Sequence, residues 1–210
     1  MSQQPAILAH SSSLTAFMRL FVALDIDDVI RNRIARFVEA VRDFAPEARW
    51  VKEESLHVTL KFIGEQPAIA VEGIQQALQT IATPPLKIGF RGYGFFPTAN
   101  SPRVFWIGME AGPELASLAA AVDEKLLALG VPKEKRKFNP HLTLARLSGG
   151  SASRRSDRGD RVDGTFQQLQ LKLAALPTPE FGTMTAHEFF LYKSQLSPKG
   201  SNYTKLARLS

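Results

Sequence analysis

The feature that most constrains the fold is a four-residue pattern that occurs twice in this chain, 84 residues apart. Histidine, any residue, threonine and leucine stand at His57–Leu60 (HVTL) and again at His141–Leu144 (HLTL). Each copy lies in a segment typical of a β-strand, and a strand followed by a helix is expected before each one. The period is too long for a solenoid and fits two lobes that each contribute one histidine-bearing strand.

The spacing within each copy indicates a shared chemistry. Residues i and i+2 of a strand point to the same face, so His57 lies beside Thr59 and His141 beside Thr143. If the two strands meet across a cleft, two imidazoles and two hydroxyls converge there. An imidazole titrates near pH 6.5, so one can be protonated while the other is neutral. This pairing suits displacement at phosphorus, in which one histidine takes a proton from the attacking hydroxyl or water and the other protonates the leaving oxygen.

A metal site and a purely structural role are the alternatives for this histidine pair. The chain has no HExxH motif, no cysteine and no carboxylate at facial-triad spacing from either histidine, so neither a metal nor a cofactor is expected. A structural role would not require threonine at the same offset twice. The other two histidines lack this partner: His10 is expected to be inert in a terminal tail, and His187 to be structural.

The rest of the chain alternates strand-like and helix-like segments. One helix is expected to begin at Asp27 and Asp28, because apolar residues from Val29 to Val41 recur at helical spacing, and two more are expected over 67–83 and 113–129. Strands are expected over 19–26, 56–63, 86–96, 104–109, 141–147, 166–176, 187–196 and 203–209. Paired strands between helices, without strict β-α-β alternation, predict an α+β fold with largely antiparallel sheets.

Two segments differ in composition from the rest. Residues 1–17 have no basic region and no long apolar run, so we expect a disordered tail rather than a secretory signal, with a single domain over 18–210. Residues 148–164 are rich in Gly, Ser, Arg and Asp and are expected to form a mobile loop. A solvated linker explains this loop better than a basic flap over an anionic substrate, because aspartates dilute its charge.

Charge and hydropathy limit the partners. The formal net charge of +6 favours anionic partners such as nucleotides or RNA. The basic run at 133–137 (KEKRK) could guide an RNA backbone, although a solvated turn is at least as good an explanation. No apolar stretch approaches the roughly 18 residues of a membrane helix, so a cytoplasmic protein without membrane contact is expected. Trp50 and Trp106 are expected in the core, whereas Phe95 and Phe96 could border the cleft.

The paired motifs resemble those of the two-histidine (2H) phosphoesterase superfamily. Longer patterns resemble the bacterial and archaeal RNA 2′,3′-cyclic phosphodiesterases, once named 2′-5′ RNA ligases, which carry H-x-T-x-x-F and then H-x-T-x-x-R. His57–Phe62 (HVTLKF) fits the first pattern and His141–Arg146 (HLTLAR) fits the second. The similarity extends over about residues 18–209 and includes 19–25, 138–140 and 191–194.

This resemblance implies a fold and a set of roles. The fold would have two pseudo-symmetric lobes, each an antiparallel sheet flanked by helices, with the active site in the cleft between them. His57 would be the general acid that protonates the ribose O3′ leaving group, and His141 the general base for water. Substrate-binding roles fall on Thr59, Thr143, Arg146 and Phe62. The threonines would hold phosphate oxygens, the arginine would grip the phosphate, and the phenylalanine would stack on the terminal base. The implied product is a 2′-phosphomonoester, formed from RNA by a metal-free monomer.

Two of these residues do not follow from regular strand geometry. Phe62 and Arg146 each lie five residues after their histidine, so a regular strand would point them away from it. A bulge or a strand end must redirect them. Phe62 is explained equally well as a core residue, whereas Arg146 is expected to be buried and to require an anion.

Two other functions stay open. The same histidine pair could serve a 2′-5′ RNA ligase or transesterase, in which an RNA 5′-hydroxyl attacks instead of water. A non-catalytic RNA- or nucleotide-binding module is the other alternative, and it would have no need for both histidines and both threonines.

Overall fold

The computed structural model describes residues 16–147, 164–197 and 200–210. The helices are α1 (Asp28–Val41), α2 (Ala70–Gln79), α3 (Pro113–Leu127) and α4 (Gln167–Ala174), with short 3-10 turns η1 (Arg42–Phe44), η2 (Glu53–Ser55) and η3 (Gly164–Phe166). The strands are β1 (Phe17–Asp25), β2 (Ala48–Trp50), β3 (His57–Pro67), β4 (Leu86–Thr98), β5 (Ser101–Ala111), β6 (His141–Leu147), β7 (Glu180–Ala186), β8 (Phe189–Ser197) and β9 (Gly200–Leu209).

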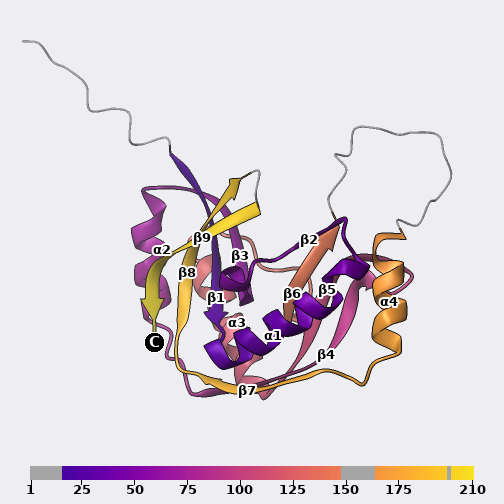
Figure 1. Cartoon of the computed structure of the whole chain (residues 1–210). Helices are drawn as coiled ribbons and strands as arrows, with labels where there is room; N and C mark the ends of the chain where they lie inside the picture. Colours follow the sequence, from indigo (N-terminus) through magenta and orange to yellow (C-terminus); the bar gives the residue numbers. More distant parts are fainter. Residues whose placement is uncertain (1–15, 148–163, 198–199) are drawn as a thin grey trace, which may run out of the picture.

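The strands form two separate sheets, which Figure 1 shows side by side. Sheet A has the order β3-β1-β8-β9 and sheet B the order β2-β6-β5-β4-β7. Every strand pairing within the described residues is antiparallel. The expected α+β fold with two antiparallel sheets and flanking helices is therefore confirmed.

Two helices cross from one sheet to the other. Helix α1 follows β1 of sheet A but packs on sheet B, where its Phe37 ring lies 5.3 Å from Phe181 on β7 and 6.5 Å from Phe105 on β5. Helix α3 follows β5 of sheet B but packs on β3 of sheet A. Because of this exchange, one continuous cluster contains most of the buried apolar side chains of both sheets, and a small second cluster of Phe21, Ala23, Phe190 and Tyr192 lies on sheet A. The two lobes therefore share a core and are fixed relative to each other.

The approach of α1 to sheet B depends on a glycine. Gly182 on β7 has φ +108°, a conformation that L-residues rarely adopt, and a Cβ there would lie 2.6 Å from Arg33 Nη1 of α1. The same guanidinium donates a hydrogen bond of 3.0 Å to the Phe181 carbonyl. Helix α1 is thus bound to β7 through both its apolar face and this polar contact.

The expected strand over 166–176 is wrong, because this segment forms η3 and α4. Leu169, Leu171 and Leu173 alternate with polar residues, and this alternation imitates a strand. In the helix, Leu169 and Leu173 are four residues apart on one face and are buried, whereas Leu171 on the other face is 63% exposed. Gln, Leu, Lys and Ala also favour a helix intrinsically.

Other boundaries differ by smaller amounts. The short strand β2 and the strand β7 were not expected, and β3 continues past Gly64 to Pro67. Gly64 has φ +85°, which lets the strand change register against β1 without ending. The expected tail over 1–17 and the expected loop over 148–164 lie outside the described residues except at their ends, where Phe17 begins β1 and Gly164 begins η3. In the part of the chain that the structure describes, no helix is both long and apolar enough to cross a membrane.

Lys61 is the one polar residue buried in the core of the described chain, and its side chain is 2% exposed. Its ammonium group donates hydrogen bonds to Asp123 on α3 and to the Pro132 carbonyl, the latter at 2.6 Å. The same Asp123 oxygen accepts the backbone N–H of Glu134 at 3.2 Å. One buried ion pair therefore ties β3 to α3 and to the segment that leads into β6.

We expect Asp123→Ala to lower the free energy of unfolding by about 3 to 5 kcal/mol, because it leaves the Lys61 ammonium buried without a partner. The double variant Lys61→Met/Asp123→Leu should lose less stability than Asp123→Ala. The neighbouring Lys133–Glu124 pair is exposed, so Glu124→Gln serves as a control that hardly changes stability. Urea denaturation of the four proteins measures the difference, and equal losses in Asp123→Ala and Glu124→Gln would contradict this role of Lys61.

Candidate active site

The two motif strands face one another across the junction of the sheets. His57 lies on β3 at the edge of sheet A, His141 lies on β6 of sheet B, and the two strands contact each other. Between them is a cavity of about 280 Å³. Its walls include every residue singled out by the motifs: His57, Thr59, Phe62, His141, Thr143 and Arg146.

The redirection expected for the sixth residue of each motif is confirmed. In the pairing of β1 with β3, Leu60 is skipped between Thr59 and Lys61, and in the pairing of β5 with β6, Leu144 is skipped between Thr143 and Ala145. These bulges bury two successive residues in each strand and return the next one to the outer face. Both motifs consequently show the same order of half-buried, buried and exposed positions, and their sixth residues join the histidine face.

The two imidazoles are held in the same way. Nδ1 of His57 lies 2.7 Å from the Ser55 carbonyl oxygen, and Nδ1 of His141 lies 2.8 Å from the Asn139 carbonyl oxygen. A carbonyl can only accept, so each Nδ1 carries the hydrogen. In the neutral imidazole Nε2 is then the basic nitrogen, and within the described residues it has no hydrogen-bond partner. Each histidine thus offers Nε2 for proton transfer.

Burial lowers the pKa of both histidines below the ordinary value of 6.5. For His57, the hydrogen bond to Ser55 and the negative charge of Asp25 oppose this effect, whereas Arg146 and Arg31 add to it. For His141, the hydrogen bond to Asn139 opposes burial and Arg146 adds to it. Two charges therefore act on His57 and not on His141: the carboxylate of Asp25 favours the protonated form of His57, and the guanidinium of Arg31 disfavours it.

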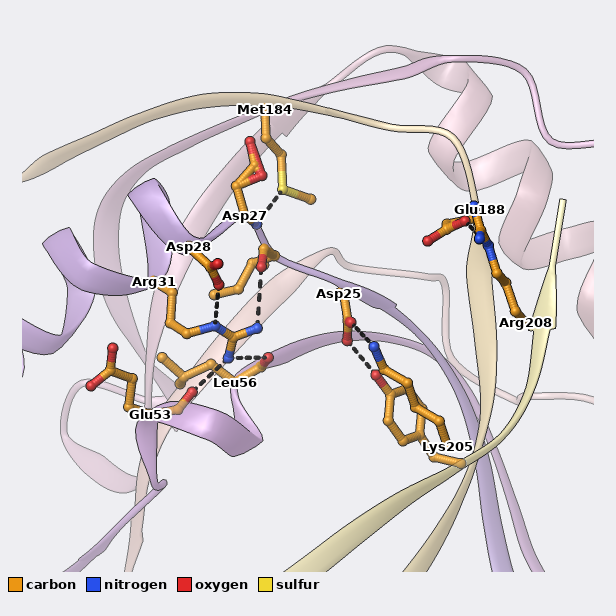
Figure 2. A network of polar contacts seen from close by, with 12 residues as sticks. Asp25, Asp27, Asp28, Arg31, Glu53, Leu56, Met184, Glu188, Lys205 and Arg208 are labelled. Carbon is orange, nitrogen blue, oxygen red and sulfur yellow. Dashed lines mark hydrogen bonds and ion pairs between the residues drawn. The ribbon is translucent and has the colours of Figure 1, made fainter.

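Asp25 belongs to a polar cluster at the end of β1, part of which Figure 2 shows. It pairs with His57 in the β1–β3 register, and its carboxylate accepts hydrogen bonds from the Tyr192 hydroxyl and the Lys205 ammonium group. Burial and the hydrogen bond to Asp25 raise the pKa of Tyr192, so its hydroxyl stays protonated and acts as a donor. These two donors hold the carboxylate in place beside the first histidine.

Arg31 on α1 fixes the backbone that precedes His57. Its guanidinium donates to the carbonyls of Glu53 at 2.6 Å, Ile26 at 3.1 Å and Leu56 at 3.5 Å (Figure 2). Leu56 is the residue before His57, and η2 carries the Ser55 carbonyl that orients the imidazole. Helix α1 therefore positions the first histidine even though it packs on the other sheet.

Aromatic side chains form the walls beside each imidazole. The Phe21 ring lies 4.8 Å from the His57 ring, and Tyr203 lies 5.1 Å from it in an edge contact. On the other side, Phe96 contacts His141 edge-on at 4.9 Å. Trp106 stacks on Phe96 at 4.9 Å and lies 6.3 Å from His141, so its expected place in the core is wrong.

The sequence does not identify Phe21 and Tyr203 as parts of the site. Phe21 is on β1, which pairs with β3, and Tyr203 on β9 contacts His57, and both contacts join residues that are far apart in the sequence. Phe21 alternates with Leu20 and Val22 on β1 and, from the sequence alone, cannot be distinguished from a core residue. Trp50 was placed correctly: it packs against Phe105 at 6.0 Å and donates from Nε1 to the Ala45 carbonyl at 3.1 Å.

The expectations for Arg146 and His187 can also be compared with the structure. Arg146 is exposed, not buried, and its Nη2 lies 3.4 Å from Thr143 Oγ1. The guanidinium needs no buried counter-ion in this position and is accessible to an anion in the cavity. His187 is exposed before β8 and does not line the cavity of the other two histidines. His10 lies outside the described residues.

We expect the Cε1–H resonances of His57 and His141 to titrate below pH 6.5 in proton NMR, because burial disfavours both imidazolium ions. Asp25→Asn should lower the pKa of His57 further and leave His141 unaffected. Arg146→Gln should raise the pKa of both histidines. Spectra of His57→Gln and His141→Gln assign the resonances, and an equal response of both histidines to Asp25→Asn would contradict this account of the asymmetry.

Known proteins resemble this chain over most of its length. Residues 27–181 match the model of the 2'-5' RNA ligase superfamily. A relative from Archaeoglobus fulgidus named RNA 2',3'-cyclic phosphodiesterase is 35% identical, over 90% of this chain and 98% of that protein. One of the same name from Methanocaldococcus jannaschii is 34% identical, over 89% of this chain and 96% of that protein.

Solved structures agree with this relationship. Escherichia coli LigT complexed with 3'-AMP has a TM-score of 0.71 and 27% identity, with 92% of this chain and 97% of that chain covered. The same protein complexed with phosphate has a TM-score of 0.66 and 27% identity, with 91% and 96% covered.

Proposed function

The chain belongs to the 2'-5' RNA ligase superfamily, and from this premise we propose that it hydrolyses the 2′,3′-cyclic phosphate end of RNA to a 2′-phosphomonoester without a metal ion. The observation that carries the proposal is the pair of imidazoles in one cavity, each with Nδ1 bonded to a backbone carbonyl and Nε2 available. The names of the relatives support the RNA substrate.

The reaction needs one base and one acid on opposite sides of the phosphorus. His141 Nε2 takes a proton from water as the water oxygen bonds to phosphorus, and the bond from phosphorus to O3′ breaks. His57 gives its Nε2 proton to O3′, which leaves a 3′-hydroxyl and a 2′-phosphate. Protons balance, because the one taken by His141 replaces the one given by His57, and exchange with solvent resets the pair.

One charged neighbour supports His57 as the acid. An acid must carry a proton before the reaction, and Asp25 favours the protonated form of His57 but does not act on His141, although burial and Arg31 oppose this effect at His57. An anionic phosphodiester in the cavity would raise the pKa of both imidazoles and offset the effect of burial. Arg146 has the opposite effect on both, which helps to keep His141 neutral as a base.

The other motif residues supply binding. Arg146 at the cavity wall can give a bidentate pair of hydrogen bonds to non-bridging phosphate oxygens, and Thr59 and Thr143 can each donate one. Phe62 is 57% exposed at the rim, so its ring is available to stack on the terminal base. A stacking contact of this kind tolerates any base.

The first test is a mass measurement on an RNA oligonucleotide with a 2′,3′-cyclic phosphate, incubated in EDTA. Wild type should add one water and produce a 2′-phosphate end. His57→Ala and His141→Ala should each lose about 10²- to 10⁴-fold in rate, because each removes one proton transfer. His187→Ala is the matched control and should retain full activity, because this exposed histidine is outside the cavity.

Other outcomes point to other functions. Joining to a second RNA with a 5′-hydroxyl, in place of water addition, would favour the ligase that the family name describes. Binding without any change of mass would favour a non-catalytic module. Activity lost in EDTA and restored by zinc or magnesium would overturn the metal-free mechanism.

A second test uses the pH dependence. The profile of kcat/KM should be bell-shaped, because one imidazole must be protonated and the other neutral. Asp25→Asn should move one limb to lower pH, since loss of the carboxylate lowers the pKa of His57 alone. A parallel shift of both limbs would contradict the assignment of the acid.

A further inference from the structure

A second and larger cavity, of about 610 Å³, continues from the proposed active site. The two cavities share the residues Thr59, Phe62, His141 and Arg146. Beyond these, the second cavity is lined by the hairpin of β4 and β5 and by the segment between α3 and β6. We call this cavity the basic groove, because Arg103, Arg136 and Lys137 line it in addition to the shared Arg146 and the buried, ion-paired Lys61.

These three cations are available to a ligand. Arg103, Arg136 and Lys137 are exposed, and within the described part of the chain none of them forms an ion pair. Apart from the shared Arg146, the first cavity has Arg19 as its cation, and Arg19 is paired with Glu65 at 3.2 Å. Among the described residues, the only carboxylate that lines the basic groove is Glu134. The groove therefore carries a net positive charge beside the site proposed for the phosphate.

Aromatic rings accompany these charges. Phe62 stands at the boundary of the two cavities, and Phe96 and Phe138 line the basic groove with half-buried rings. Cations that follow a groove together with rings on which bases can stack are the features by which proteins bind single-stranded nucleic acid without strong sequence preference.

Both walls of the basic groove are anchored in the fold. On one side, Lys61 holds the Pro132 carbonyl and its partner Asp123 holds the Glu134 N–H. On the other side, the Gln170 side chain donates to the Ala99 carbonyl at the hairpin tip, at 2.7 Å. A preformed groove requires less ordering when it binds a ligand, which favours affinity.

We propose that the basic groove binds the RNA strand on the 5′ side of the terminal cyclic phosphate, and this inference rests on the proposed function. A 2′,3′-cyclic phosphate is the last group of a strand, so the rest of the chain must leave the site through the 5′ oxygen of the terminal ribose. Of the two cavities, the larger one carries three further unpaired cations besides the shared Arg146, and it adjoins Arg146 and His141 where the phosphate is placed. Oligonucleotides should therefore be better substrates than cyclic mononucleotides.

The test compares kcat/KM for a 2′,3′-cyclic mononucleotide with kcat/KM for an oligonucleotide of about eight residues that has the same 3′ end. The triple variant Arg103→Ala/Arg136→Ala/Lys137→Ala should reduce the ratio of oligonucleotide to mononucleotide activity by tenfold or more, to about one. The matched control Arg36→Ala/Lys87→Ala/Lys125→Ala removes the same charge from exposed residues that line neither cavity, and it should keep the wild-type ratio.

Salt dependence gives a second readout. Each phosphate contact to a single strand contributes about 0.7 to the slope of log affinity against log salt concentration. The triple variant should therefore reduce this slope by about 2 for the oligonucleotide, measured by fluorescence anisotropy with each protein.

The outcomes separate this inference from the proposed function. If wild type hydrolyses neither substrate, the proposed function fails, and anisotropy with the same oligonucleotide still decides whether the basic groove binds RNA. If wild type hydrolyses both but the triple variant keeps the wild-type ratio and salt slope, the basic groove is not the path of the strand. If the control variant lowered the activity ratio and the salt slope as much as the triple variant does, the effect would be a general attraction between the net charge of the protein and RNA. This result would also overturn the inference.

Discussion

The shared apolar core under both sheets is the interaction on which the rest of the structure depends. Helix α1 leaves sheet A and packs on sheet B, and helix α3 leaves sheet B and packs on sheet A. Most of the buried side chains of both sheets consequently form one cluster. A close-packed interior of this kind has few alternative arrangements, so the distance between β3 and β6 is fixed by the fold and not by a flexible hinge. A preorganised pair of imidazoles is the consequence.

Polar contacts orient the segments that precede the two motif strands, whose positions are set by the core. Arg31 and Lys61 act on the two motif segments from buried or half-buried positions, the first through carbonyls before His57 and the second through the segment before β6. Each is a cation whose hydrogen bonds go to backbone carbonyls or to a single carboxylate. Side chains of this kind hold loops that have little apolar surface of their own, and both the histidine orientation and the wall of the basic groove depend on them.

The site is symmetric in geometry and asymmetric in charge. Both motifs have the same bulge, the same hydrogen bond from Nδ1 and the same exposed sixth residue, as two copies of one arrangement. Asp25, held by Tyr192 and Lys205, acts on one histidine only. Two equivalent imidazoles would have similar proton affinities, and an acid–base pair works best when they differ. The carboxylate of Asp25 contributes to such a difference because it favours protonation of His57 and not of His141.

The sequence by itself determined the two strands that carry the motifs, the shared face of each His–Thr pair and the need for a bulge before Phe62 and Arg146. These follow from the strand period of two, which is a local property of the backbone. The local pattern gives the wrong secondary structure where the same residues fit both the strand period and the helix period. Leu169, Leu171 and Leu173 alternate as in a strand, and the burial of Leu169 and Leu173 on one face shows that the segment is a helix.

Only the tertiary structure decided which side chains surround the two imidazoles. Phe21 and Trp106 are aromatic residues on apolar strands, so their sequence context is that of core residues, whereas Tyr203 lies on the polar and largely exposed strand β9. The charge of Asp25 acts through space on His57, 32 positions away in the chain. Arg103 and Arg136 line one groove because the β4–β5 hairpin and the segment before β6 come together in three dimensions. These contacts join residues that are far apart in the sequence, so they are determined by tertiary packing and no local sequence pattern predicts them.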